Sequence, residues 1–131
     1  MNNPTNGMGT TTTTTDSSLV DSDHVQGTAV FDPSGKDIGT IKRLIIDKVS
    51  GRVVYTVAQF GGFLGLGGKE YTIPWQKLDY DTSLGGFRTD ITEAQLRGAP
   101  DFYESGSSEY PDRERETTFN AYYGSENYWD E

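Results

Sequence analysis

Short apolar stretches separated by turn residues occupy the middle of the chain, between residues 25 and 91. The two longest, residues 38–47 and 52–60, are separated by a short polar segment that ends in glycine and is typical of a tight turn. Valine, tyrosine and threonine dominate the second stretch, a composition that favours a half-buried strand. We therefore expect these two stretches to pair as an antiparallel hairpin.

Four shorter stretches have the same character, and we expect strands at residues 28–31, 70–73, 77–80 and 86–90. The first is followed by Asp32, Pro33, Ser34 and Gly35, a turn in which proline presets φ and glycine supplies a positive φ. Six short strands with turns every few residues predict a mainly β fold, a small six-stranded barrel. After the last strand, Thr92 is expected to cap a helical turn that Gly98 ends.

The pattern of the 38–47 stretch leaves two possibilities for its inward face. One set consists of Gly39, Ile41, Arg43 and Ile45, and the other of Ile38, Thr40, Leu44 and Ile46. Apolar residues occur on both faces towards the end of this stretch, as expected for a barrel wall that is also covered from outside. One further core residue is expected at Trp75, which directly follows Pro74 at a strand end and should be largely buried.

The tail is rich in aromatic residues for so charged a segment, since five of the eight tyrosines and one of the two tryptophans lie at or beyond residue 103. Phe119, Tyr122 and Tyr123 have the i, i+3, i+4 spacing of one helix face, and Gly124 is suited to end the helix. We expect a helix over residues 112–123 whose aromatic side chains, together with Trp129, pack on a barrel, either the chain's own or a neighbour's. A barrel this small would gain stability from such a contact.

Acidic residues are concentrated outside the barrel and account for the net charge of −9. Residues 1–24 carry three acidic residues and no basic one, residues 25–104 carry ten and nine, and residues 105–131 carry seven and two. These segments are predicted to be a disordered threonine-rich lead-in, a barrel domain and an acidic, aromatic-rich tail. A nearly neutral domain lacks the clustered basic residues that phosphate backbones require, which argues against direct nucleic-acid binding.

Composition also excludes several kinds of site. The chain has no cysteine, and therefore no disulfide, thiolate chemistry or cysteine-bound metal. His24 is the only histidine and lies at the edge of the lead-in, so we expect it to be solvated and predict neither a metal nor a cofactor. The N-terminus lacks the features of a secretory signal, and no apolar segment is long enough to span a membrane. We expect a soluble, cytoplasmic protein.

Three apolar residues, Phe63, Leu64 and Leu66, stand in a loop that otherwise consists of glycine. The loop does not match a phosphate-binding loop, because Phe63 occupies the place of its first glycine and Glu70 replaces the hydroxyl residue after Lys69. It also joins a strand to a strand, so no helix N-terminus is present to bind phosphate. Two interpretations remain: the apolar residues plug one end of the barrel, or they dock another protein or a second copy.

Three segments resemble the PRC-barrel domain, the small β-barrel of the photosynthetic reaction-centre H subunit and of ribosome maturation factors. They are GKDIG at residues 35–39, VVYTVAQFGGFLGLGGK at residues 53–69 and IPW at residues 73–75. The charged tail that leads into Tyr-Tyr-Gly and a final aromatic residue is similar to the ending of stand-alone bacterial members. The resemblance implies a barrel fold and a binding role, because these relatives are binding modules.

We therefore expect a non-catalytic protein-binding or scaffold module, with an unidentified protein or a second copy as its partner. The alternatives are an accessory factor in RNA or ribosome metabolism that acts through a ribosomal protein, and a small-molecule sensor that uses the barrel interior. An enzyme is not expected, because the carboxylates fall in turns and tails and no nucleophile–base pattern is present. The candidate partner contacts are Phe63, Leu64, Leu66, Tyr122, Tyr123 and Trp129.

Overall fold

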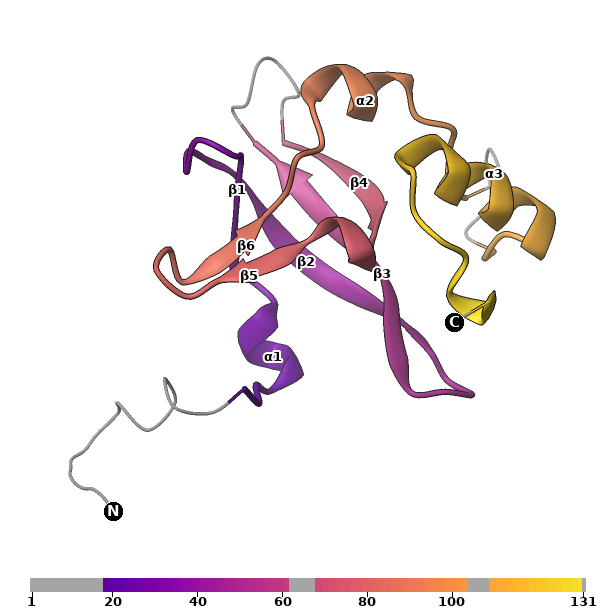
Figure 1. The fold of residues 1–131 in the computed structure, drawn as a ribbon, viewed down its shortest axis with the longest axis horizontal. Helices are drawn as coiled ribbons and strands as arrows, with labels where there is room; N and C mark the ends of the chain where they lie inside the picture. The colour runs from indigo at the N-terminus through magenta and orange to yellow at the C-terminus, as the bar shows by residue number, and fades with distance from the viewer. Residues whose placement is uncertain (1–17, 62–67, 104–108, 131) are drawn as a thin grey trace.

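The computed structural model describes residues 18–61, 68–103 and 109–130, and its centre is a six-stranded mixed sheet. The strand order is β4-β3-β2-β1-β6-β5, so two strands that are consecutive in the chain, β4 and β5, form opposite ends of the sheet. In Figure 1 the β5–β6 pair lies in front of β2, which shows how strongly the sheet curls. The prediction of a mainly β, six-stranded fold is confirmed.

The strands are β1 Ala29–Phe31, β2 Asp37–Asp47, β3 Arg52–Phe60, β4 Lys69–Pro74, β5 Asp79–Asp81 and β6 Gly86–Arg88. β2 and β3 form the expected antiparallel hairpin, and β4 pairs antiparallel with β3. β1 pairs antiparallel with β2 and parallel with β6, which makes the sheet mixed. β5 starts later than expected, because a 3₁₀ turn, η2 Trp75–Lys77, follows Pro74 and the N–H of Leu78 donates to the Trp75 carbonyl.

An irregularity in β2 decides which of its side chains face the core, and neither predicted alternation holds along the whole strand. The pairing with β3 shifts between Ile41 and Arg43, so Lys42 is an extra residue in the ladder. Ile41 is buried before the shift, whereas Ile46 is 52% exposed beyond it. The shift therefore places apolar side chains on both faces of the strand and leaves one of them in solvent.

The barrel interior is filled by side chains from five strands, namely Val30, Ile38, Ile41, Val54, Ala58, Phe60, Ile73 and Phe87. β2 and β3 come close together at Gly39, which explains the second glycine of the GKDIG segment. A Cβ at Gly39 would lie 2.6 Å from the carbonyl oxygen of Gln59 and 2.9 Å from the Phe60 ring. Gly86 has the same role in β6, where a Cβ would lie 2.6 Å from the Ala29 carbonyl oxygen.

Helical segments flank the sheet: α1 Ser22–Val25, α2 Glu93–Gly98, α3 Arg113–Tyr123 and a second 3₁₀ turn, η3 Tyr128–Asp130. α1 begins inside the segment expected to be disordered, because Val25 is buried and the Thr28 hydroxyl donates to the His24 carbonyl at 2.8 Å. The rest of the predicted lead-in, residues 1–17, lies outside the described residues.

The helical turn after β6 forms as predicted. The Thr92 hydroxyl accepts a hydrogen bond from the Gln95 N–H at 3.1 Å, and the Gln95 side chain accepts one from the Thr92 N–H at 2.8 Å. α2 ends at Gly98 as predicted, although Gly98 does not adopt the left-handed conformation. It is the last helical residue, it lies next to the Tyr122 hydroxyl, and the extended backbone of Ala99 ends the helix.

The close approach at Gly39 predicts that Gly39→Ala lowers the free energy of unfolding by about 1–3 kcal/mol, because the added methyl group overlaps backbone atoms of β3. Gly61→Ala is the matched control, since a Cβ there would lie 3.7 Å from the Cα of Gly68. Urea denaturation of both variants measures the difference. Equal midpoints for the two variants would contradict the packing of β2 on β3.

Candidate functional site

The tail helix α3 forms as predicted and packs against β3. The Asp112 carboxylate caps its first turn by accepting a hydrogen bond from the Arg115 N–H at 2.9 Å. Gly124 ends the helix in the left-handed conformation, with φ of 70°. Figure 1 shows α3 along one side of the sheet, with the last residues returning towards β3. The predicted helix over residues 112–123 is confirmed.

The contact between the tail and the barrel centres on the hydroxyl of Tyr55 in β3. This hydroxyl donates to Oε1 of Glu116 at 2.8 Å and accepts a hydrogen bond from Nδ2 of Asn120 at 3.2 Å. All three side chains are buried, and Asn120 also donates to Oδ1 of Asn127 at 3.1 Å. A buried polar group without a partner costs about 1–3 kcal/mol, so the barrel and the tail satisfy polar groups that neither could bury alone.

Aromatic rings surround this hydrogen-bonded group. The Tyr55 ring meets Phe102 at 4.8 Å, Phe119 at 5.8 Å and Tyr128 at 6.0 Å between ring centroids, each time edge to face. Such pairs contribute about 0.5–1.5 kcal/mol each beyond the area that they bury. One strand residue thereby joins the segment after α2, the helix α3 and the end of the chain.

The three tail residues predicted as partner contacts lie in different surroundings. Tyr123 is 3% exposed and belongs to the chain's own core. Tyr122 is 38% exposed, and its hydroxyl donates to the Gln95 carbonyl at 2.7 Å, which ties α3 to α2. Trp129 is half-buried. The Arg113 guanidinium lies 4.0 Å from the centroid of its ring in a cation–π contact, and the Tyr128 ring lies 4.9 Å away.

The other three predicted contact residues, Phe63, Leu64 and Leu66, lie outside the described residues. Whether they plug the barrel or dock a partner stays a prediction from the sequence.

A cleft of about 370 Å³ runs between β3, η2 and the tail. Its polar groups hold the tail in place: the Arg52 guanidinium donates to the Tyr128 carbonyl at 2.8 Å, and Oε1 of Gln76 accepts from the Glu126 N–H at 3.0 Å. Trp75 borders this cleft. It contacts the Phe87 ring at 5.3 Å and packs against the core while part of its surface stays exposed, so the expected burial is met in part.

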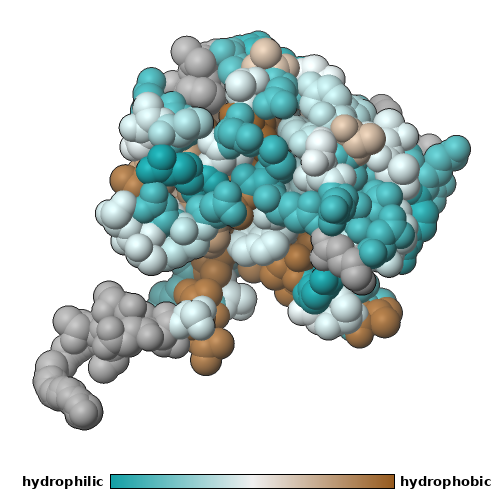
Figure 2. Space-filling view, in the orientation of Figure 1, coloured by the Kyte–Doolittle hydropathy of each residue, from teal (hydrophilic) through white to brown (hydrophobic). Residues whose placement is uncertain are grey.

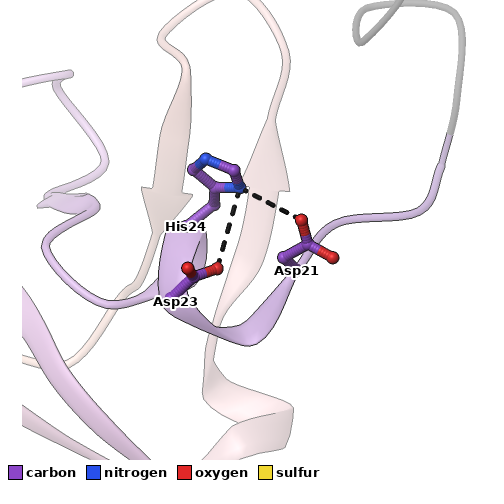
Figure 3. A group of neighbouring side chains, drawn as sticks. All are labelled: Asp21, Asp23 and His24. Carbon is purple, nitrogen blue, oxygen red and sulfur yellow. Dashed lines mark ion pairs between the residues drawn. The ribbon is translucent and has the colours of Figure 1, made fainter.

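One group of side chains near α1 has the chemistry of metal ligands. Asp21, Asp23 and His24 place their ligand atoms within 4.8 Å of one another, and Nδ1 of His24 is 3.6 Å from the Asp21 carboxylate (Figure 3). All three residues are exposed. A metal-binding imidazole is normally oriented by a fixed second partner, and an exposed acidic group of this kind is common without an ion. We assign no metal to it.

Three acidic side chains of the described residues have lowered pKa values, and each of them stabilises a turn. Hydrogen bonds from serine hydroxyls hold the pKa of these aspartates below its ordinary value. The pairs are Asp32 with Ser34 at 2.6 Å, Asp47 with Ser50 at 2.7 Å and Asp81 with Ser83 at 2.5 Å. Among the described residues, no buried pair of carboxylates and no serine–histidine pair provides the geometry of a catalytic site.

The described surface instead exposes several large apolar side chains, of which only Ile46 was considered from the sequence, and then as a possible core residue. Val49 in the β2–β3 turn is 92% exposed and Ile46 is 52% exposed, while Leu19 and Val20 before α1 are 86% and 64% exposed. In Figure 2, apolar surface gathers on the side where α1 and the β2–β3 hairpin project from the barrel. The sequence indicated this exposure only at the end of the 38–47 stretch, where apolar residues occur on both faces of the predicted strand.

Within the described parts of the chain, no helix combines the length and apolar character needed to cross a membrane.

The family model of the PRC-barrel domain matches residues 20–96. No curated protein matches the chain. Among solved structures, the chain is similar to RimM, described as a 16S ribosomal RNA processing protein, from Pseudomonas aeruginosa, with 20% identity and a TM-score of 0.42. That match covers 57% of this chain and 45% of the other.

The burial of the tail contact predicts that stability falls at alkaline pH. Burial raises the pKa of Tyr55 and Tyr123 in the folded chain above the ordinary value of 10.0. Their contribution to stability is therefore complete below pH 10 and is lost as the pH rises further, because the unfolded chain ionises first. Each tyrosine should add about 1.4 kcal/mol per pH unit to this loss.

Tyr55→Phe tests this directly. At neutral pH it should lower the free energy of unfolding by about 1–3 kcal/mol, because Glu116 and Asn120 lose their buried partner. Above pH 10 its stability should fall less steeply than that of the wild type, whereas Tyr80→Phe, an exposed change in β5, should match the wild type. Urea denaturation at several pH values measures both effects. Parallel pH profiles for Tyr55→Phe and the wild type would rule out a buried, neutral Tyr55.

Proposed function

Because the chain belongs to the PRC-barrel domain family, we propose that it acts as a non-catalytic module that binds another protein. The observation that carries this proposal is the exposure of Ile46 and Val49 on the β2–β3 hairpin, beside which Leu19 and Val20 are exposed on a separate projection before α1. We call the surface around Ile46 and Val49 the hairpin surface. Exposed apolar clusters on a small domain commonly mark contacts with other proteins.

The polar groups of the domain support a binding role over catalysis. The buried Tyr55, Glu116 and Asn120 satisfy one another, and Arg52 and Gln76 in the cleft hold the tail. The aspartates with lowered pKa values stabilise turns. A catalytic group needs a position from which it reaches a substrate, and these groups are already committed to holding the fold.

The packing also weighs against the alternative of a small-molecule sensor. A sensor of this kind requires space inside the barrel. Val30, Ile41, Ala58, Phe60 and Ile73 are all fully buried in the interior, so side chains fill the place where a ligand would bind. The hairpin surface remains the better candidate for a functional contact.

We predict that Val49→Asp removes a protein partner without unfolding the chain, because Val49 is 92% exposed and makes no contribution to the core. Affinity capture after chemical cross-linking in the native lysate compares the wild type, Val49→Asp and the control Tyr80→Ser, which changes an exposed side chain on β5. At least one protein captured by the wild type and the control should be lost with Val49→Asp. With that protein purified, the Kd should rise about tenfold or more. Identical captured sets for all three chains would contradict the proposal.

A further inference from the structure

We draw no further inference here: the strongest candidate, the cleft between β3, η2 and the tail, is lined by polar groups that already hold the tail in place, and nothing in the structure shows what it would bind.

Discussion

The buried hydroxyl of Tyr55 is the contact on which the rest of the structure depends. It belongs to β3, and its two hydrogen-bond partners, Glu116 and Asn120, belong to a helix more than sixty residues later in the chain. Removing the helix would leave the hydroxyl unpaired and expose the ring together with Phe102. Since a buried polar group without a partner is costly, the barrel and the tail stabilise each other. The acidic tail is therefore part of the folded core.

This constraint also determines which surface is open to a partner. The tail covers one face of β3, and Arg52 and Gln76 fasten its last residues beside η2. The interior is filled by apolar side chains, so the inside of the barrel leaves no room for a partner. The α1 and hairpin side has exposed apolar residues, and there the described residues give the end of β2 a strand partner only in β3.

Local signals in the sequence predicted most of the fold. The turn residues and β-branched composition located β3 at its observed bounds, and Asp112, the aromatic spacing and Gly124 located α3. What the sequence could not show depends on contacts between distant residues. The extra residue at Lys42 breaks the alternation of β2, which is why neither predicted inward set holds. The hydrogen bond between Tyr55 and Glu116 joins residues 61 positions apart, and no local pattern predicts it.

Native-state amide hydrogen exchange of the full chain is the measurement that tests the central claim most directly. If the tail helix and the barrel form one cooperative unit, the amides of Asn120 and Tyr123 in α3 should exchange with the same free energy of opening as the slowest amides of β3. The free energy of opening of both groups of amides should also fall with urea concentration at the same slope, since they would open only by global unfolding. Exchange of the α3 amides at the rate of an isolated helix, while β3 stays protected, would show that the tail is not part of the core.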